Sequence, residues 1–338
     1  MERSKGATSK DVALLAGVSQ STVSRVFNPK TDRNVKDEIR MKVLEAAKQL
    51  DYKPNIIARS LVSKRTNMIG VVVGNPIGPF YSKIITRVTS KIQENGCQPL
   101  IFTLDTKLDI QGIVDKVLQY QVDGVIITSS ALSEEIANEC VLNDLPVVLF
   151  NIYKPNSNVS CVYSDNIEAG ELAAKLFLNT DHKHIVYVGY ENEASTVSDR
   201  KEGFLNTLNS NGITNIEEKY CDYKYEDGYK VGLNILREKK IPDAIFCVSD
   251  LIAMGIMDAI KYESKFSIPK DISIIGFDDI PQASYKSYEL TTIHQPIERL
   301  ISRTLSILFQ LIDKSKDSII IEKVSPNLVI RKSTKPIE

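Results

Sequence analysis

The stretch TSKDVALLAGVSQSTVSRVFN, residues 8–28, contains two short helical patterns with a single glycine between them. Thr8 followed three positions later by Asp11 is an acidic variant of the capping box, which predicts a helix start at this point. Gly17 interrupts the pattern, and Ser19 soon after it can cap a second helix. The stretch therefore predicts two short helices joined by a tight turn.

Each predicted helix has an apolar side that should face inward. These inner positions are Val12, Leu15 and Ala16 in the first helix and Val23, Val26 and Phe27 in the second. A third pattern runs from about residue 36 to residue 50, with the apolar stripe Ile39, Val43, Ala46, Ala47 and Leu50. Two short helices joined by a turn and supported by a third helix form a helix-turn-helix.

The outer side of the second helix carries groups that suit DNA. In a helix-turn-helix this helix enters the major groove with its N-terminal residues toward the base edges. The Gln20 amide can pair with adenine, and the Arg25 guanidinium with guanine. Short polar groups suited to phosphates or to this outer face are Ser19, Ser21, Thr22, Ser24 and Asn28. The spacing alone also permits a plain three-helix bundle whose exposed face is polar.

Charge is unevenly distributed along the 338 residues, although the whole chain has a formal net charge of only −1. Residues 1–66 carry a net charge of +7, and the remaining residues carry a net charge of −8. A small basic head on an acidic body indicates a polyanionic partner for the head, and an ordinary solvated surface is the alternative.

Composition and length exclude several classes of protein. The length predicts two or three domains, and a hydrophobic fraction of 43% excludes a mostly disordered chain. No apolar run approaches the roughly 20 residues of a membrane helix, and the N-terminal MERSKGATSK lacks the apolar stretch of a secretory signal. We therefore expect a cytoplasmic protein with no membrane partner. The cysteines are far apart with no Cys-x-x-Cys, which predicts small buried thiols rather than zinc ligands or disulfides.

The segment KPNIIARSLVSKRT, residues 53–66, follows the three predicted helices. Pro54 ends what precedes it, and Asn55 can cap a helix of about two turns that reaches Ser63, too short to be stable alone in water. A basic, apolar and marginally stable segment beside a DNA-reading module indicates folding upon DNA binding, with Leu61 as a minor-groove wedge. A linker helix packed on the body is the alternative.

The body alternates short apolar runs with amphipathic stretches. The apolar runs that predict strands span residues 68–74, 99–104, 124–128, 146–150, 185–189, 244–248 and 272–276. Near-continuous apolar runs separated by helices indicate parallel strands covered on both faces, and seven such runs suggest two sheets.

Ligands of open α/β sheets bind at the carboxyl ends of the strands. Polar residues follow the predicted strands at Asp105, Asn151, Ser249–Asp250 and Asp278–Asp279. No dinucleotide-binding glycine motif, phosphate-binding loop or nucleophile elbow is present in the sequence. His182 and His184 could share a strand face and bind a metal, but no third ligand accompanies them, so we expect surface histidines. The sequence thus offers a binding cleft, with no candidate catalytic group, cofactor or metal site.

The stretch 8–28, with its Ala-Gly-Val-Ser and Thr-Val-Ser-Arg steps, resembles the N-terminal signature of the LacI/GalR-type repressors. Residues 53–73 resemble the hinge and first core strand of that family. The loop NPKTDRNV, residues 28–35, is about two residues longer than is usual there. Later stretches similar to the family's effector core are GPFYSKII (78–85), SDRKEGF (198–204), CVSDLIAMG (247–255), IIGFDD (274–279), LTTIHQPIERL (290–300) and NLVIRKST (327–334).

The resemblance implies a small all-α helix-turn-helix head followed by a two-subdomain α/β core with parallel sheets, similar to periplasmic sugar-binding proteins. It implies a DNA-binding domain at residues 1–52, a hinge helix and linker at 53–66, and an effector-binding and dimerisation core at 67–338. The core would divide into an N-subdomain (about 67–164 and 293–323) and a C-subdomain (about 165–292 and 324–338), with crossings near residues 164, 292 and 323. Two heads of a homodimer would read a pseudo-palindromic double-stranded DNA operator.

The resemblance also implies particular contacts for each partner. Besides the second helix, hinge contacts to DNA would come from Asn55, Ala58 and Leu61. Contacts to a small, sugar-like effector would come from Phe80, Tyr81, Asn151, Arg200, Tyr223, Ser249 and Asp278. Ser249 stands where the family usually has Asn, which shortens that donor. The function expected is an effector-controlled transcription regulator, a repressor; the alternatives are a soluble sugar-binding protein without a DNA role and an enzyme on the same core.

Overall fold

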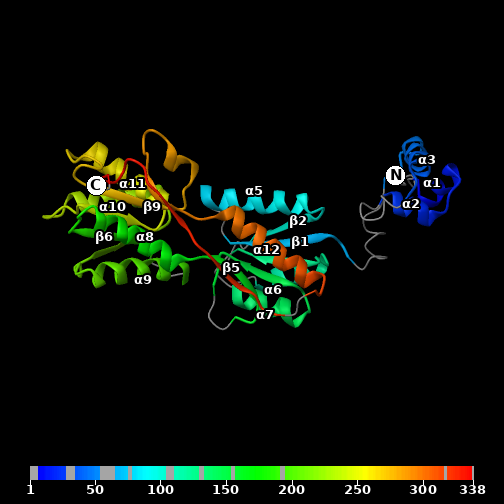
Figure 1. Ribbon diagram of the computed structural model, residues 1–338, viewed down its shortest axis with the longest axis horizontal. Coiled ribbons are helices and arrows are strands. Elements are labelled where there is room, and N and C mark those ends of the chain that lie inside the picture. Colours follow the sequence, from blue (N-terminus) through cyan, green and yellow to red (C-terminus); the bar gives the residue numbers. More distant parts are fainter. Residues whose placement is uncertain are drawn as a thin grey trace. The chain divides into compact units, whose positions relative to one another are not determined.

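The computed structural model describes residues 7–27, 35–53, 65–74, 78–103, 110–128, 133–153, 157–190, 195–315 and 318–336. The chain divides into two compact units, Met1–Thr66 and Asn67–Glu338. Figure 1 labels the helices of the first unit and the helices and several strands of the second.

Among its described residues, the first unit contains three helices, α1 (Ser9–Ala16), α2 (Gln20–Val26) and α3 (Asp37–Gln49). The predicted capping box is confirmed, because the Thr8 side chain accepts from the Asp11 amide and Asp11 accepts from the Thr8 amide in return. Gly17 ends α1 with a φ of 66°, and Ser19 caps α2 through the Thr22 amide. The described part of the head therefore has the local structure of a helix-turn-helix.

The small core of the head is made by one face of each helix. Its buried members are Val12, Ala13, Val23, Val26, Val43, Ala46 and Ala47. The prediction that Leu15 faces inward is wrong, because Leu15 is 51% exposed. At 100° per residue the side of α1 that packs is centred between Val12, Ala13 and Ala16, and Leu15 lies about 100° away from that centre.

The second unit is built on two six-stranded sheets, which confirms the prediction of two sheets. The strand order is β11-β5-β4-β3-β1-β2 in the first sheet and β12-β10-β9-β8-β6-β7 in the second. All pairings are parallel except that of β10 with β12. The first sheet contains β1 (Met68–Val73), β2 (Gln98–Thr103), β3 (Gly124–Ile127), β4 (Val147–Phe150), β5 (Ser160–Ser164) and β11 (Ile321–Val324). The second contains β6 (Ile185–Gly189), β7 (Glu217–Tyr220), β8 (Ala244–Cys247), β9 (Ser273–Phe277), β10 (Thr291–His294) and β12 (Asn327–Val329).

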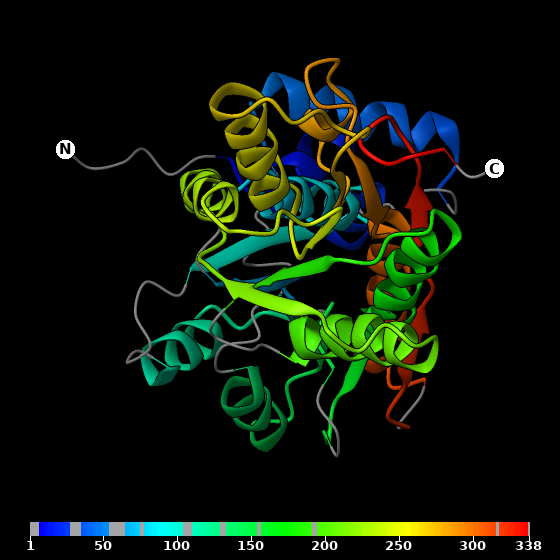
Figure 2. The same cartoon turned by 90° about the vertical axis from the view of Figure 1, so that its left-hand side faces the viewer.

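Helices cover both faces of each sheet, as near-continuous apolar strands require. On the first sheet, α5 (Pro79–Glu94) and α12 (Ile297–Ile312) share a core with Val71, and α6 (Ile110–Gln119) and α7 (Ser133–Leu142) share another with Val72 on the opposite face. On the second sheet, α8 (Asn166–Asn179) and α9 (Ser195–Ser210), drawn green, lie on one side, while α10 (Tyr225–Leu236) and α11 (Asp250–Glu263), drawn yellow, lie on the other (Figure 2).

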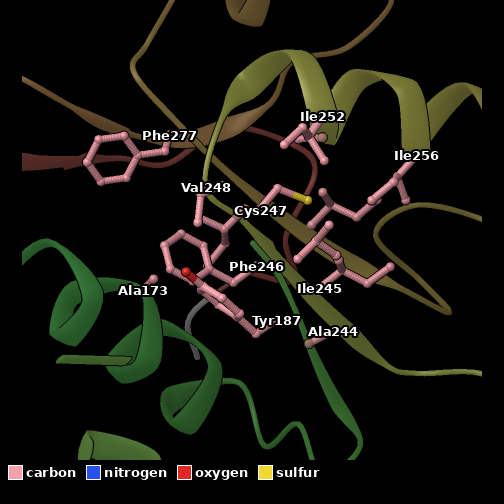
Figure 3. Close-up of a cluster of buried hydrophobic side chains, with 14 of the residues drawn as sticks. Ala173, Tyr187, Ala244, Ile245, Phe246, Cys247, Val248, Ile252, Ile256 and Phe277 are labelled. Carbon is pink, nitrogen blue, oxygen red and sulfur yellow. The ribbon is translucent and has the colours of Figure 1, made fainter. Parts of the chain in front are cut away.

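The core of the second sheet is one continuous cluster. Figure 3 shows part of it, where the rings of Tyr187 of β6 and Phe246 of β8 lie side by side, and Ile252 and Ile256 of α11 lie on the other side of β8. The described cysteines are free thiols. Cys140, Cys161 and Cys247 are buried, as the sequence predicted, whereas Cys97 and Cys221 are only half-buried.

Five strands escaped the prediction from apolar runs. Three of them, β7, β11 and β12, lie at sheet edges, and β7 and β11 contain the charged sequences EEKY and IEKV. The other two, β5 and β10, lie inside their sheets but read SCVYS and TTIH, so their hydroxyl groups hide the apolar pattern. Edge and hydroxyl-rich strands lack the continuous apolar run on which such a prediction depends.

The chain passes between the two sheets three times. It leaves the first sheet after Ser164 of β5 and returns after His294 of β10, where α12 packs on the first sheet. It then passes from β11, in the first sheet, to β12, in the second. These passages bring residues from distant parts of the sequence to the region between the sheets.

Close packing of α8 on α9 depends on two glycines. A Cβ at Gly170 would clash with the backbone carbonyl of Arg200, and a Cβ at Gly203 would clash with that of Ile167. Because these contacts are with backbone, no side chain can move aside to make room. The pair therefore sets how near α9, which carries Arg200, lies to α8.

We predict that Gly203→Ala destabilises the second unit by on the order of 2–3 kcal/mol, the cost of overpacking against rigid backbone. Thermal unfolding followed by circular dichroism measures the shift. Gly70→Ala is the matched control, because its added Cβ would meet only side chains, at 3.3 Å or more. Equal shifts in the two variants would contradict the claim that backbone contact between α8 and α9 sets the cost.

Candidate functional site

Side chains that follow strands of both sheets lie near side chains of α5 and α9. We call this group the inter-sheet cluster, and it consists of Phe80, Tyr81, Asn151, Tyr190, Arg200, Tyr223, Asp278 and Gln295. Phe80, at the start of α5, packs against the hydrophobic cores of both sheets. The Tyr81 hydroxyl is near enough to Asp278 and Arg200 for their charges to shift its pKa, and the same holds for Tyr223. Residues more than 100 positions apart in sequence are thus assembled into one polar and aromatic group.

Arg200 is held in a fixed orientation although it is only 5% exposed. Its Nε donates to Asn166 Oδ1 at 2.8 Å and its Nη1 donates to the Val248 carbonyl at 3.1 Å. The guanidinium also lies 3.5 Å from the centroid of the Phe277 ring, a cation–π arrangement. A buried guanidinium with two donors and one face already engaged presents its remaining edge with little loss of rotamer entropy.

Asp278 follows β9 directly and has a φ of 107°, a backbone conformation that residues other than glycine rarely adopt. Its Oδ1 accepts a hydrogen bond of 2.8 Å from Gln295 Nε2. Burial raises the pKa of Asp278 to about 7, although Arg200, the Gln295 hydrogen bond and Lys83 each act to lower it. The carboxyl group is therefore close to half-protonated near neutral pH.

The next residue, Asp279, has the opposite environment. It accepts from His294 Nδ1 at 2.9 Å and from Arg331 Nη2 at 2.6 Å. Burial alone would raise the pKa of Asp279, but these hydrogen bonds and the Arg331 charge hold it at about 2. Of two adjacent carboxyl groups, one is thus a permanently ionised structural anion and the other is a titrating group of the inter-sheet cluster.

Aromatic rings line the same region. Tyr190 and Tyr223 lie with their centroids 4.8 Å apart at an angle of 47°, and Phe80 meets Tyr81 edge-on at 5.7 Å. Tyr81 as a whole is 44% exposed, yet burial is the main cause that raises the pKa of its hydroxyl, followed by the charge of Asp278. Such rings can stack on the flat face of a ligand while Arg200 and Asp278 hydrogen-bond its edge.

Two residues predicted as ligand contacts have side chains occupied by the protein itself. Ser249 is 3% exposed, and its hydroxyl caps α11 by accepting from the Ile252 amide at 3.3 Å. Asn151 accepts from the Ser164 amide at 3.1 Å and donates to Gln295 Oε1 at 2.8 Å. A ligand would have to share or displace these bonds, whereas Arg200 and Asp278 each have capacity left.

Two members of the inter-sheet cluster, Tyr190 and Gln295, and one residue that holds Arg200, Asn166, were absent from the sequence prediction. Tyr190 directly follows β6, and that position at a strand end was the available signal. Gln295 lies within the stretch LTTIHQPIERL that was singled out, but its role depends on where a crossing segment runs. Asn166 gave no signal, because its contact with Arg200 joins two helices that only the fold brings together.

In the head, the outer face of α2 is available to a partner. Ser19, Gln20, Ser21, Ser24 and Arg25 are exposed, and Thr22 is half-buried. Gln20 Nε2 donates to Ser9 Oγ at 2.9 Å, which orients the amide from α1. The Ser19 hydroxyl lies 2.8 Å from that of Ser21 and is engaged in capping α2. Asn28, Asn55, Ala58, Leu61 and Asp105 lie outside the described residues.

No group of three His, Cys, Asp or Glu side chains that could hold a metal ion occurs among the described residues. His182 is 1% exposed, with its Nδ1 2.8 Å from Thr180 Oγ1, so the expectation that it lies at the surface is wrong. It packs edge-on against Phe177, and burial lowers its pKa. His184 Nδ1 lies 3.1 Å from the Ile241 carbonyl. Among the described helices, none is long and apolar enough to cross a membrane.

Each of the two units matches a family of known proteins. Residues 8–55 match the family described as bacterial regulatory proteins, lacI family, and residues 66–328 match periplasmic binding proteins and sugar binding domain of LacI family. The HTH-type transcriptional repressor PurR of Pasteurella multocida (strain Pm70) is 33% identical over 97% of this chain and 99% of its own length.

Solved structures give the same result. The lac repressor dimer bound to operator and the anti-inducer ONPF matches with a TM-score of 0.85 and 25% identity, over 98% of this chain and 99% of that one. The complex of the transcriptional regulator CelR with cellobiose matches with a TM-score of 0.72 and 25% identity, over 97% of this chain and 99% of that one.

The raised pKa of Asp278 has a consequence for stability. Because the folded protein binds the Asp278 proton more tightly than the unfolded chain, ionising this group costs the folded state free energy. The cost is absent below about pH 4 and complete above about pH 7, where a shift of about three units corresponds to on the order of 4 kcal/mol at most.

We therefore predict that Asp278→Asn, which retains an acceptor for Gln295, raises the unfolding temperature at pH 8 and has little effect at pH 4. Thermal unfolding of both proteins at the two pH values measures the difference. A gain of the same size at both pH values would contradict the assignment of a titrating, desolvated carboxyl group.

Proposed function

The chain belongs to the lacI family of bacterial regulatory proteins and is a DNA-binding transcriptional repressor, and on this premise we propose that a small hydroxylated ligand at the inter-sheet cluster sets its affinity for operator DNA. The observation that carries the proposal is that Arg200, Asp278 and Tyr223 lie close together. Arg200 is near enough to Asp278 to lower its pKa, and the charges of both act on the pKa of Tyr223. A guanidinium donor, a carboxyl acceptor and a flat ring together match the donors, acceptors and apolar faces of a sugar.

A sugar or sugar derivative is the ligand class that we favour. The family matched by residues 66–328 is described as containing a sugar binding domain, and the structurally similar CelR is in complex with cellobiose. Arg200 can donate to paired ring hydroxyls, and Asp278 can accept from another. A purine base is the second candidate, since its flat face would also stack on the Tyr190–Tyr223 pair.

The DNA-reading part of the proposal rests on α2. Its exposed Gln20 and Arg25 carry the amide and guanidinium that read adenine and guanine in the major groove, and the head as a whole has a net charge of +7. A single small head reads only a few base pairs, so we propose that two heads of a homodimer bind the two halves of a pseudo-palindromic operator. The site of action would be the cytoplasm, where bacterial DNA is accessible.

Neither a soluble sugar-binding protein without a DNA role nor an enzyme on the same core fits membership of this family. The similarity to PurR covers the head as well as the core, which argues against a sugar-binding protein without a DNA role. The relatives are transcriptional repressors rather than enzymes.

The ligand class is tested by isothermal titration calorimetry of the full-length protein. The panel contains D-ribose, cellobiose, a sugar phosphate, a sugar acid and the purine bases. We expect one sugar-type compound to bind, and a purine as the tightest ligand would replace the sugar assignment. An operator is selected in parallel by gel shift from random DNA, where a palindromic winner is expected.

We predict that Arg200→Ala and Asp278→Ala abolish the response of operator binding to the panel compound that binds wild type. Removing one partner of a buried charged hydrogen bond costs roughly 2–5 kcal/mol, enough to lose binding of a weak ligand. Gel shifts with and without the compound measure the response, and in Arg200→Ala, which leaves the bond between Gln295 and Asp278 intact, operator affinity without the compound should stay near that of wild type. Unchanged affinity for the compound in either variant would remove that residue from the site.

We predict that Arg25→Ala loses about 1–3 kcal/mol of preference at one base position, the value of a bidentate arginine–guanine contact. Competition binding with operators changed at single positions measures the loss. Lys10→Ala, a change of the same charge at the start of α1 in the same head, is the control and should weaken specific and random DNA alike, if at all. Equal weakening by Arg25→Ala on specific and random DNA would show that Arg25 contacts only phosphate.

A further inference from the structure

A continuous chain of hydrogen bonds runs from one sheet to the other through Gln295. The Ser164 amide donates to Asn151 Oδ1 at 3.1 Å, and Asn151 Nδ2 donates to Gln295 Oε1 at 2.8 Å. Gln295 Nε2 then donates to Asp278 Oδ1 at 2.8 Å. Asn151 follows β4 of the first sheet and Asp278 follows β9 of the second, so the chain of bonds joins the two halves of the inter-sheet cluster.

The direction of every bond in this chain is fixed by the backbone. The Ser164 amide can only donate, so the Asn151 oxygen must be the atom that faces it. The Asn151 nitrogen therefore faces Gln295 and requires an acceptor there, which assigns the Gln295 oxygen. The Gln295 nitrogen is left to face Asp278, where a carboxylate oxygen is the complementary acceptor. Reversing either amide would place like groups against each other.

Gln295 cannot replace these bonds with water. It is 0% exposed, whereas Asn151 and Asp278 at the two ends are half-buried. A buried amide that loses a partner without gaining another costs roughly 1–3 kcal/mol. If Asp278 no longer accepts from Gln295, we therefore expect Gln295, or the backbone that carries it, to move toward another partner.

Both ends of the chain are also strained. Asn151 has a φ of 55° and Asp278 a φ of 107°, and side-chain hydrogen bonds that hold such residues stabilise a conformation they would otherwise leave. The backbone of Gln295 lies in the passage from β10 to α12, and α12 packs on the first sheet. Movement of Gln295 is thereby passed both to Asn151, through the side chain, and to α12, through the backbone.

We propose that Gln295 is the positioning residue that transmits the hydrogen-bonding state of Asp278 in the second sheet to Asn151 in the first. The proposal rests on the proposed function in that a ligand at Asp278 is the natural cause of such a change. A ligand hydroxyl that donates to Asp278 Oδ1 competes with Gln295 Nε2, and the loss is passed to Asn151 and to the Ser164 amide. Ligand occupancy and the relation between the sheets are then linked through one side chain.

Amide hydrogen exchange in the full-length protein without ligand tests this coupling. The readout is the exchange rate of the Ser164 amide, which stands at the opposite end of the hydrogen-bond chain from Asp278. It is measured in a double-mutant cycle of Asp278→Ala and Gln295→Met. Methionine keeps the approximate length of glutamine but makes neither hydrogen bond. We expect Asp278→Ala to speed exchange at Ser164 about fivefold or more when Gln295 is present, and to have no further effect in Gln295→Met.

Gln310→Met is the control, because it makes the same change on α12, which also packs on the first sheet. It should leave Ser164 exchange as in wild type. The proposal is overturned if Asp278→Ala does not change Ser164 exchange, or if it speeds exchange equally in the wild-type and the Gln295→Met backgrounds. Because no ligand is present, these outcomes are independent of whether the panel compounds bind.

A second variant guards against a merely structural effect of Gln295→Met. In Gln295→Glu a protonated carboxyl group offers one donor and one acceptor, as the amide does, whereas an ionised one repels the Asp278 carboxylate. The charged or titratable groups that face Asp278 and its neighbour Asp279 are Tyr81, Lys83, Arg200, Tyr223, Asp250, His294 and Arg331.

We expect Ser164 exchange in Gln295→Glu, corrected for the intrinsic effect of pH, to match wild type at pH 5 and to exceed it about fivefold at pH 8. Wild type measured at the same two pH values accounts for titration of Asp278 itself and of the groups around it. A corrected rate that differs from wild type by the same factor at both pH values would also overturn the proposal.

Discussion

The threefold passage of the chain between two parallel sheets is the constraint on which the rest of the core depends. Since parallel strands end at the same edge of a sheet, the residues that follow them collect there, and the passages hold the two edges against each other. Asn151 after β4 and Asp278 after β9 become neighbours of one glutamine in this way. The glycine contact between α8 and α9 then fixes Arg200 beside them.

The electrostatics of the site depend on how far nearby cations and hydrogen bonds offset the burial of each carboxyl group. Asp279 has two cationic or hydrogen-bonding partners and a pKa of about 2, whereas Asp278, one residue earlier, has a pKa of about 7 because its burial is only partly offset. A protein selected for stability alone would neutralise Asp278 fully. Because its burial is only partly offset, the Asp278 carboxyl group destabilises the folded state at neutral pH. It also keeps an acceptor to which a ligand can donate, an arrangement typical of functional sites.

Sequence reasoning was most successful where one local interaction decides the structure. The Thr8–Asp11 capping box, the Ser19 cap and the seven apolar strands depend on near neighbours, and the structure contains each of them. It failed where burial is decided by packing between elements, as for Leu15 and His182. It could name Asp278 from its position after a predicted strand and Arg200 from the resemblance to a family. It could not name Gln295 or Asn166, whose partners Asn151 and Arg200 lie 144 and 34 residues away and are supplied by the fold.

Under the proposed function the head and the inter-sheet cluster are two sites of one equilibrium, and coupling between two binding sites is reciprocal. The most direct test is therefore the affinity of the full-length protein for its panel compound, measured by calorimetry with and without saturating palindromic operator DNA. We expect operator to change this affinity by about fivefold or more, and by the same factor by which the compound changes operator affinity. Equal affinities with and without operator would contradict it.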